Sequence, residues 1–367
     1  MKYINGRREA IQTISLSLGG LLISPSLFAS IKKEPTKKLG VALVGLGNYS
    51  NLQLASALQQ TEYCYLAGIV TGSPEKAKTW AEKYNISPPN IYNYETFDQI
   101  KNNPAIDIIY IVLPNFMHAE YTIRAAKAGK HVICEKPFSM NVAEGEKMIL
   151  ACKAANVKLS VGYRLYFEPH HLETRRLGTS KAFGKIKLIE SSLGFPRPSP
   201  TSWRLDKTKG GGGAIMDLGV YAIQGARLTI GEDPIAVTAQ AFNFDKEHFK
   251  DIYESVLWTF EFPSGAIAQC STTYAAYIDR LYTTCEKGWF ELSPAYNAAG
   301  IKGKTINGDM IFNTPNYQQI AQIDSFANSI LNNTEPIASG EEGLKDVKLI
   351  DFILKAAESG KRIKIEL

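Results

Sequence analysis

The chain has 367 residues, of which 45% are apolar, and it carries a formal net charge of +5. This length is enough for two domains with sizeable cores, and the near balance of 41 basic and 36 acidic residues gives no indication of nucleic-acid binding. The five cysteines are odd in number and widely spaced, without a Cys-x-x-Cys motif. We therefore expect buried free thiols rather than a disulfide framework.

Residues 1–30 read as an export leader. The pair Arg7-Arg8 precedes an uncharged, mainly apolar segment at 11–29. Adjacent arginines are typical of the twin-arginine route, which exports proteins that have already folded. The alternative is a retained anchor, because about 19 apolar residues are just enough to span a bilayer. Ser and Gly dilute the segment, so we expect cleavage and a periplasmic protein without stable membrane insertion.

Apolar runs alternate with helical patterns through the first half of the chain. This alternation predicts repeated strand–helix–strand units and therefore an α/β fold with a doubly wound parallel sheet. The nearly all-apolar run at 106–114 is typical of a central parallel strand that is covered on both faces. The expected strands are 39–45, 63–71, 106–113, 130–134 and 157–162, and the expected helices are 52–60, 74–84, 117–128 and 142–156.

A glycine turn follows the first expected strand and precedes a helix, which is the context that a dinucleotide-binding turn requires. Gly45 permits the tight turn, and Gly47 lets the backbone approach a pyrophosphate. The amides at the helix start supply a positive end for the phosphates. Ser50 stands where the third glycine of the pattern is usual, so an ordinary strand–helix turn is the alternative interpretation.

The tip of the second expected strand indicates which nicotinamide cofactor the turn binds. An NAD site usually carries Asp or Glu there for the ribose hydroxyls. This chain has no carboxylate at the tip, and Thr71, Ser73 and Lys76 offer hydroxyls and a charge to a 2′-phosphate. The pattern favours NADP, although Ser73 and Pro74 fit equally well as the cap and first residue of a helix.

Two separate segments supply candidate catalytic residues. Lys136 follows an expected strand and precedes Pro137, and strand carboxyl ends face the ligand crevice in such sheets. Later in the chain, the glycine run 210–213 leads to Asp217 and Tyr221, whose spacing of four puts both on one face of a helix. Hydride transfer from an alcohol leaves a proton on oxygen. A tyrosine beside a lysine can take that proton, because the ammonium group favours the phenolate.

Four motifs occur in the order seen in one known family. They are Gly45-Leu46-Gly47, Glu135-Lys136-Pro137, Gly162-Tyr163-Arg164 with Pro169, and the stretch from Trp203 to Val237. Together they resemble the glucose–fructose oxidoreductase/inositol dehydrogenase (Gfo/Idh/MocA) family over nearly the whole chain after the leader. The last stretch looks most like the periplasmic glucose–fructose oxidoreductase branch, and Tyr221 stands where many other members carry His.

This resemblance implies a Rossmann NADP-binding domain at 37–162 and a substrate and oligomerisation domain at 163–367. The second domain would contain a large, open, mostly antiparallel sheet, which in this family often mediates dimers or tetramers, so a homo-oligomer is expected. The second half of the sequence contains alternating patterns that agree with such a sheet. The strands expected there are 185–194, 235–244, 252–262, 266–274 and 280–286, and the helices are 317–331 and 343–359.

The catalytic candidates are Lys136, Asp217 and Tyr221, and no metal site is expected. His170 and His171 stand beside Glu173, but adjacent histidines diverge on a helix. Three cofactor candidates have structural alternatives: helix packing for the histidine at 118, a domain-interface ion pair for the arginine at 164, and a core position for the tryptophan at 203. The cofactor-binding candidates are Gly45, Leu46, Gly47, Asn48, Tyr49, Thr71, Ser73, Lys76, Pro114, Asn115, His118, Glu135, Lys136, Arg164, Trp203 and Arg204.

The sequence thus predicts an exported, NADP-dependent oxidoreductase that acts on a sugar or polyol. Outside the cytoplasm there is little free NADP, so a tightly held cofactor would be recycled in place by oxidising one sugar and reducing another. Two alternatives stay open. One is an NAD-dependent glycosidase of the same family, in which a His-containing motif replaces the Asp217/Tyr221 arrangement. The other is a non-catalytic sugar or nucleotide sensor on the same fold.

Overall fold

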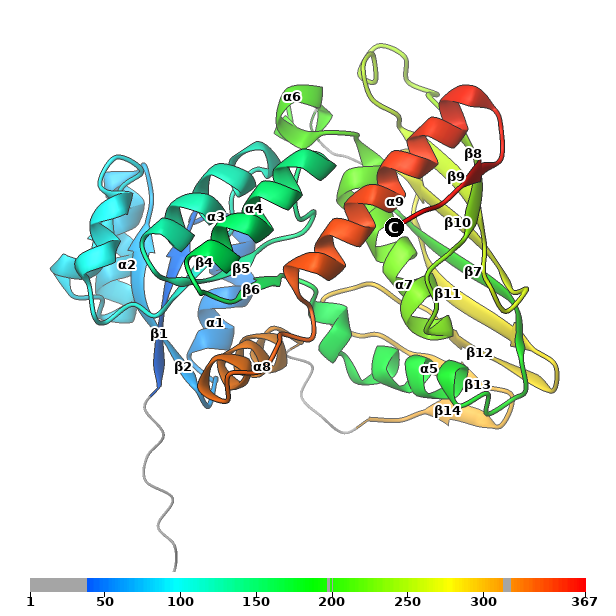
Figure 1. Cartoon of the computed structure of the whole chain (residues 1–367), viewed down its shortest axis with the longest axis horizontal. Helices are drawn as coiled ribbons and strands as arrows, with labels where there is room; N and C mark the ends of the chain where they lie inside the picture. Colours follow the sequence, from blue (N-terminus) through cyan, green and yellow to red (C-terminus); the bar gives the residue numbers. More distant parts are fainter. Residues whose placement is uncertain (1–37, 197–198, 200, 313–317) are drawn as a thin grey trace, which may run out of the picture. The chain divides into compact units, whose positions relative to one another are not determined.

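The computed structural model describes residues 38–196, 199, 201–312 and 318–367, so the expected leader lies outside the described residues. Lys38–Leu367 form one compact unit, which contains a six-stranded and a nine-stranded sheet (Figure 1). No helix in these ranges is long and apolar enough to cross a membrane. The five cysteines are free, as predicted; four of them are buried and Cys285 is half-buried.

The first sheet has six parallel strands in the order β3-β2-β1-β4-β5-β6, which confirms the predicted doubly wound arrangement. Its central strand β1 is buried along its whole length, as expected for a strand covered on both faces. The strand order reverses between β1 and β4, and ligands bind at the carboxyl ends beside such a reversal. The strands are β1 (Leu39–Val44), β2 (Cys64–Val70), β3 (Ile91–Tyr92), β4 (Ile108–Ile111), β5 (His131–Cys134) and β6 (Leu159–Val161).

Helices connect these strands, and local capping fixes where they start. The Ser73 hydroxyl caps α2, with Pro74 in the first turn, and the Asn141 side chain caps α4. The late helix α8 also packs on this sheet, since its Asp324 accepts hydrogen bonds from two backbone amides just before β2. The helices are η2 (Ser50–Leu54), α1 (Ala55–Leu58), α2 (Pro74–Tyr84), η3 (Pro88–Asn90), η4 (Phe97–Asn102), η5 (Asn115–Met117), α3 (His118–Lys127), α4 (Val142–Ala154) and α8 (Gln318–Leu331).

The second sheet has nine strands in the order β14-β13-β12-β11-β7-β10-β9-β8-β15, all paired antiparallel except β7 with β10. Buried and exposed residues alternate along β9 and β11, because one face of the sheet packs on helices. The strands are β7 (Ile186–Gly194), β8 (Ala236–Phe242), β9 (Ser255–Glu261), β10 (Ile267–Thr273), β11 (Ile278–Cys285), β12 (Gly288–Leu292), β13 (Gly303–Thr305), β14 (Gly308–Met310) and β15 (Ile363–Lys364).

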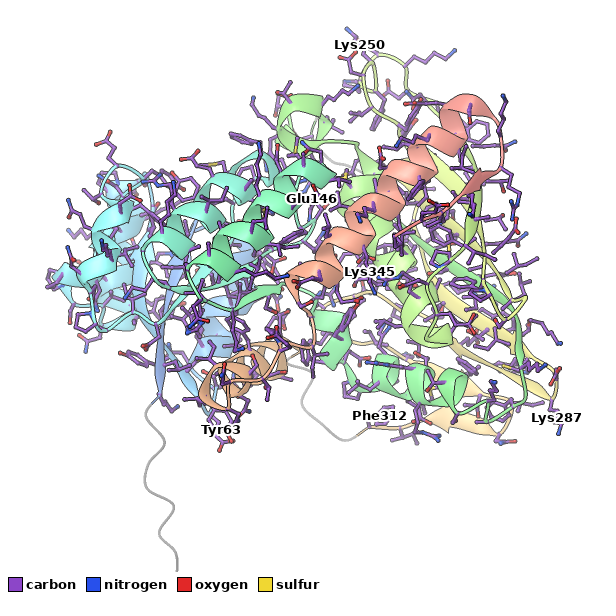
Figure 2. The ribbon with its side chains drawn as sticks, viewed as in Figure 1. Tyr63, Glu146, Lys250, Lys287, Phe312 and Lys345 are labelled. Carbon is purple, nitrogen blue, oxygen red and sulfur yellow. The ribbon has the colours of Figure 1, made fainter. Side chains whose placement is uncertain are left out.

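Helices α5, α7 and α9 lie on the buried face of the second sheet (Figure 1). The glycine run 210–213 lies between β7 and α7 in the chain. The long loop between β8 and β9 carries exposed side chains such as Lys250 (Figure 2). The helices of this half are η6 (Arg164–Phe167), α5 (Pro169–Thr179), η7 (Trp203–Leu205), α6 (Lys207–Gly210), η8 (Ile215–Gly219), α7 (Val220–Ile230) and α9 (Gly340–Ser359).

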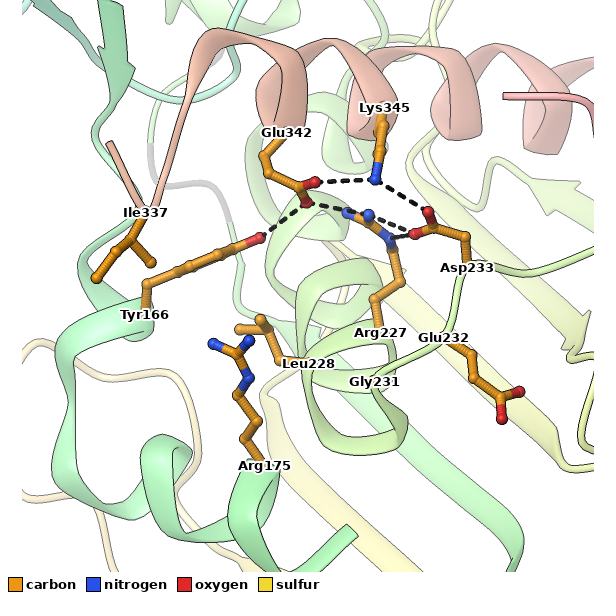
Figure 3. Close-up of a pocket in the computed structure, with 10 residues that line it drawn as sticks. All are labelled: Tyr166, Arg175, Arg227, Leu228, Gly231, Glu232, Asp233, Ile337, Glu342 and Lys345. Carbon is orange, nitrogen blue, oxygen red and sulfur yellow. Dashed lines mark hydrogen bonds and ion pairs between the residues drawn. The ribbon is translucent and has the colours of Figure 1, made fainter. Parts of the chain in front are cut away.

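A buried ion network joins α7 to α9 (Figure 3). Arg227 Nη1 lies 2.7 Å from Asp346 Oδ1, and its Nη2 lies 3.1 Å from Glu342 Oε2 and also contacts Asp233. Lys345 Nζ bridges Asp233 and Glu342 at 3.0 and 2.9 Å. Burial raises the pKa of the Asp346 carboxyl. Arg227 is therefore needed to keep that carboxylate charged inside the protein.

Candidate active site

The turn after β1 has the shape that a dinucleotide phosphate requires. Gly45 has a φ of 92°, and a Cβ at this position would lie 2.4 Å from the carbonyl oxygen of Val112. Gly47 faces open space. Ser50, which replaces the third glycine, is buried and donates from its hydroxyl to the Gly45 carbonyl oxygen at 2.6 Å. The serine closes the turn from inside and leaves its outer side open.

The polar residues at the end of β2 have two different roles. Thr71 and Lys76 line the cavity described below, and Lys76 Nζ donates to the carbonyl oxygen of Leu46 in the glycine turn at 3.2 Å. The Ser73 side chain instead caps α2, because its hydroxyl accepts from the Lys76 amide at 3.3 Å, and it does not line the cavity. The helix-cap interpretation therefore fits Ser73, and the polar side chains that face the cavity at the end of β2 are Thr71 and Lys76.

Lys136 and Asp217, 81 positions apart in the chain, meet beside Tyr221. Lys136 follows β5, and Asp217 lies in the π-helical turn η8 that leads into α7. Lys136 Nζ donates to the backbone oxygen of Asp217 at 2.6 Å and to its Oδ1 at 3.1 Å. The same Nζ lies 4.8 Å from the ring centroid of Tyr221. The fold thus brings the three predicted catalytic side chains into one cluster.

Both carboxylate oxygens of Asp217 are engaged. Oδ1 binds Lys136, while Oδ2 accepts from the Tyr274 hydroxyl at 2.9 Å and lies 3.2 Å from Arg204 Nε. Burial alone would lower the pKa of Lys136, but the negative charges available on Tyr221 and Asp217 outweigh it and raise that pKa. The lysine is therefore charged, and Asp217 holds it through Oδ1 and its backbone oxygen.

A second cation lies against the ring of Tyr221. The guanidinium carbon of Arg164 is 5.0 Å from the Tyr221 centroid. Arg164 is buried, and it donates to the carbonyl oxygens of Tyr296 at 2.5 Å and Asn297 at 3.1 Å and to the side-chain oxygen of Gln318. Arg164 lines the cavity, and its hydrogen bonds to the segment after β12 hold its guanidinium beside the Tyr221 ring.

Next to Lys136 lies a buried carboxyl group. Glu135 Oε1 accepts from the Tyr110 hydroxyl at 2.8 Å, and Oε2 accepts from the Lys136 amide at 3.1 Å. Tyr110 in turn accepts from Gln322 Nε2 at 2.7 Å. Burial raises the pKa of Glu135. A Cβ at Gly162 would lie 2.4 Å from Glu135 Oε1, so the glycine provides the space that this carboxyl occupies.

Two candidates near the start of α3 have different surroundings. Asn115 lines the cavity, and its side-chain amide donates to the carbonyl oxygen of Gly210 at 2.8 Å. His118 is fully buried, with its ring nitrogens 2.8 Å from the Pro137 oxygen and 2.9 Å from the Leu113 oxygen. Burial lowers the pKa of His118. Its place is in the packing behind the cavity wall, which favours the structural alternative over cofactor contact.

The predicted site residues surround one cavity of about 890 Å³, within the size range of small-molecule sites. Every catalytic and cofactor candidate lines it except Ser73 and His118. Trp203 is a half-buried part of this wall rather than a core residue, with the Arg204 guanidinium 4.4 Å from its ring centroid. Further lining residues, which were not among the catalytic and cofactor candidates, are Leu52, Gln53, Tyr94, Val112, Leu113, Leu193, Phe195, Leu218, Tyr296, Asn297 and Ala298.

Most of these residues carry no local signal, because only Leu218, next to Asp217, belongs to a glycine, lysine or carboxylate motif. Leu193 and Phe195 stand at the end of β7, and the strand's position in the sheet alone brings them to the cavity. Tyr274, which holds Asp217, lies just after β10. The one signal in the sequence is that these residues stand at the ends of expected strands.

The adjacent histidines are used in packing. His170 Nδ1 lies 2.8 Å from Glu168 Oε1, and His171 Nε2 lies 2.8 Å from the carbonyl oxygen of Ala295. Burial lowers the pKa of His171 to about 4. Within the described ranges, no three His, Cys, Asp or Glu side chains are grouped so that they could hold a metal ion.

Three solved or curated proteins match nearly the full length of the chain. The crystal structure of an aldose-aldose oxidoreductase from Caulobacter crescentus, complexed with glycerol, is 38% identical, with a TM-score of 0.88, over 90% of this chain and 100% of that one. A D-xylose 1-dehydrogenase [NADP(+)] from Haloarcula marismortui is 27% identical over 89% of this chain and 92% of its own length. An inositol 2-dehydrogenase from Rhizobium meliloti is 25% identical, over 88% and 98%.

Two family models match consecutive parts of the chain. Residues 39–163 match the oxidoreductase family with an NAD-binding Rossmann fold, and residues 171–291 match the GFO/IDH/MocA C-terminal domain. These ranges include the glycine turn, the lysine after β5 and the Asp217/Tyr221 cluster. The chain therefore belongs to the Gfo/Idh/MocA family of oxidoreductases.

Proposed function

We propose that the protein is an NADP-dependent oxidoreductase that transfers hydride between a sugar or polyol and the nicotinamide. The cluster of Lys136, Asp217 and Tyr221 carries this proposal, because it stands in the wall of the cavity that begins at the glycine turn. The similar proteins support it, since their names refer to aldoses, D-xylose and inositol.

The residues around the glycine turn fit a dinucleotide. Gly45 approaches the carbonyl oxygen of Val112, just after β4, so closely that no side chain would fit there. Gly47 opens the turn to a phosphate. NADP bound there would supply the hydride acceptor for oxidation and the hydride donor for reduction. In this proposal Tyr221 takes the proton of the reacting hydroxyl during oxidation and returns it during reduction.

The neighbouring charges define the other two roles. Lys136 stabilises the phenolate of Tyr221 by its charge, and Asp217 holds the lysine in position through Oδ1 and its backbone oxygen. A positioned acid–base group of this kind contributes roughly 10²–10⁴-fold to the rate. Because Tyr274 and Arg204 occupy the other oxygen of Asp217, the carboxylate keeps its orientation during the proton transfer.

We infer a preference for NADP over NAD from the tip of β2. Thr71 and Lys76 line the cavity there, and the carboxylate that would bind ribose hydroxyls is absent from residues 71–74. The D-xylose 1-dehydrogenase that resembles this chain is named for NADP, which supports the same choice.

We further propose that the enzyme reaches the periplasm already folded around its cofactor. The support is the sequence of residues 1–30, with Arg7-Arg8 before an uncharged apolar segment. An enzyme that cannot exchange NADP must recycle it, so the proposed reaction oxidises one sugar and reduces a second in alternating half-reactions.

Protein purified from the exported fraction tests this proposal. Denaturation should release NADP, and the intact protein should gain absorbance at the reduced-nicotinamide band with one sugar and lose it with another, without added cofactor. Release of NAD together with cleavage of an aryl glycoside without net redox would indicate the glycosidase instead. A bound nucleotide that no sugar reduces would indicate the sensor.

A further inference from the structure

Residues 295–298, the strap, follow β12 and are held by two buried charged side chains. Asp279 Oδ1 accepts hydrogen bonds from the amides of the first two strap residues at 2.7 and 2.8 Å. Arg164 donates to the carbonyl oxygens of the second and third, Tyr296 and Asn297. Asp279 and Arg164 are only 7% and 6% exposed, so these charge-assisted bonds are shielded from water. The backbone of the strap is consequently fixed.

The strap also lies beside the catalytic tyrosine. The rings of Tyr296 and Tyr221 are 6.2 Å apart, and the Tyr296 hydroxyl is 2.5 Å from Ser191 Oγ on β7. Arg164 contacts the Tyr221 ring with the same guanidinium that binds the strap. One rigid unit therefore sets the distance between the strap and Tyr221.

Asn297 presents a polar side chain from this fixed backbone. It is an exposed residue that lines the cavity, and both protein contacts that involve it, from Arg164 and Gln318, go to its backbone oxygen. Within the described residues its side-chain amide binds no protein group. The amide offers two donors and an acceptor, which match the alternating donor and acceptor character of a hydroxyl. The neighbouring wall residues Leu193 and Phe195 are apolar and offer a sugar no hydrogen bond.

We propose that Asn297 determines which sugar the enzyme accepts, by hydrogen bonding a substrate hydroxyl away from the reacting carbon. This inference rests on the proposed function. The rigid link to Tyr221 fixes the spacing between the amide and the proton-transferring group. A sugar whose hydroxyl has another position or configuration covers the amide without bonding to it. The amide then loses its water and gains no partner, which disfavours binding.

The test compares the full-length protein with its Asn297→Ala and Asn297→Leu variants. Calorimetric Kd and kcat/KM are measured for D-glucose, D-mannose, D-galactose, D-xylose and 2-deoxy-D-glucose. For the sugar that the unaltered protein prefers, both variants should lose about 10-fold in kcat/KM, mainly through KM and with a matching rise in Kd. The sugar that lacks the recognised hydroxyl should keep its values, so discrimination shrinks by the same factor.

The Asn102→Ala variant is the matched control, because Asn102 is an exposed asparagine at the end of η4 and does not line the cavity. Its sugar preference should equal that of the unaltered protein. Unchanged preference in both Asn297 variants would overturn the inference. Selective sugar binding without turnover would sink the proposed function alone and leave Asn297 to be judged by Kd, whereas no binding of any sugar would overturn both.

Discussion

At the scale of single residues, Tyr221 is defined by the charges around it. Lys136 Nζ and the Arg164 guanidinium carbon lie 4.8 and 5.0 Å from its ring centroid. Both cations therefore lie beside the side chain that we propose as the proton-transferring group.

Tyr221→Phe removes the hydroxyl and keeps the ring between the cations. We expect kcat/KM to fall by roughly 10²–10⁴-fold, because the general acid–base group is lost while the packing remains. Bound NADP, measured after denaturation, should be unchanged. Tyr277→Phe is the control, since Tyr277 is 69% exposed and does not line the cavity. Full activity in Tyr221→Phe would rule out the role proposed for this tyrosine.

Thr71→Asp places a carboxylate at the tip of β2. The new charge should repel a 2′-phosphate and bind ribose hydroxyls, so the ratio of NADP to NAD affinity should fall at least about 10-fold, or about 1.4 kcal/mol. The ratio is measured from the binding of NADP and of NAD to the nucleotide-free protein. Ser73→Ala should cost about 1 kcal/mol of unfolding free energy through the lost cap without altering the ratio. A shift of the ratio in Ser73→Ala would contradict this division of roles.

Motif spacing predicted most residues of the site, because Gly45, Lys136 and the Asp217/Tyr221 pair each follow a recognisable local pattern. Whether a candidate side chain is buried behind the cavity could not be predicted from the sequence. His118 has the same place in the sequence whether its ring faces a cofactor or two carbonyl oxygens, and only the packed α3 distinguishes the two. The loop at 274–279 is expected from the sequence to influence the substrate pocket, but the contact of Tyr274 with Asp217 could not be predicted, because it depends on the position of β10.

At the scale of elements, the Arg227 network holds α7 against α9, with Lys345 extending from α9 toward it (Figure 3). The two cations are in different environments. The Arg227 side chain is 6% exposed and contacts Asp346, which is 1% exposed, whereas the Lys345 side chain is 36% exposed. The same kind of ion pair should therefore differ in its contribution to stability between these two positions.

Arg227→Met leaves Asp346 buried without its cation. We expect the free energy of unfolding to fall by about 3–5 kcal/mol in urea denaturation, the cost of an uncompensated buried charge. Lys345→Met should change it by about 0–1 kcal/mol, because its pairs are partly screened by water. Equal losses in the two variants would show that burial does not control the strength of this network.

Most strands could be predicted, and most of the shortest could not. All the expected strands are present within a few residues, including β6 with three. The five-residue strand β12 was not expected, and β3, β13, β14 and β15, with two or three residues each, are too short to show periodicity. The helix expected from residue 343 begins at Gly340, because the Ser339 side chain caps it by accepting from the Glu342 amide. Helix α5 was missed for a similar reason: Glu168 is its cap, and its two buried histidines obscured an apolar pattern.

At the scale of the whole molecule, burial of His171 couples stability to pH. Its neighbours are Glu168, Arg164, His170 and the Ala295 carbonyl, yet burial dominates and lowers the pKa to about 4. An unfolded chain takes up this proton near pH 6.5, so the contribution is complete above that pH and is lost as the pH falls toward 4.

The loss should reach roughly 3 kcal/mol of unfolding free energy from this one group between pH 6.5 and pH 4. Thermal or urea unfolding across this range measures it. His171→Gln keeps a side chain that can donate to the Ala295 carbonyl and should flatten the slope by the same amount. An unaltered slope in this variant would mean that other groups cause the acid sensitivity.

The export proposal also concerns the whole chain. Replacing Arg7 and Arg8 by lysines should leave the protein in the cytoplasm, folded and with NADP bound, because the folded-export signal needs the arginine pair. Cell fractionation and analysis of the released nucleotide measure both effects. Periplasmic protein in unchanged amount would contradict the twin-arginine route.

The order of the two sheets along the chain was predictable, but the way in which α8 joins them was not. Its sequence shows only an amphipathic helix. In the structure Ile323, Phe326 and Ala327 complete the core beside β1, while Gln318 and Gln322 reach Arg164 and Tyr110. Such a return across the fold depends on contacts between distant residues, which no local pattern encodes.

The β7–β10 pairing, parallel within an otherwise antiparallel sheet, has a consequence for the engineering of this enzyme. It places the ends of both strands on the same side, so Phe195 lines the cavity and Tyr274 binds the cavity residue Asp217, whereas the glycine turn and Lys136 come from loops of the other sheet. The two sides of the cavity are nevertheless linked, because Lys136 binds Asp217 and Arg164 contacts both Tyr221 and the strap. We expect a redesigned strap to leave the electron carrier undisturbed only where it preserves the contacts of Arg164.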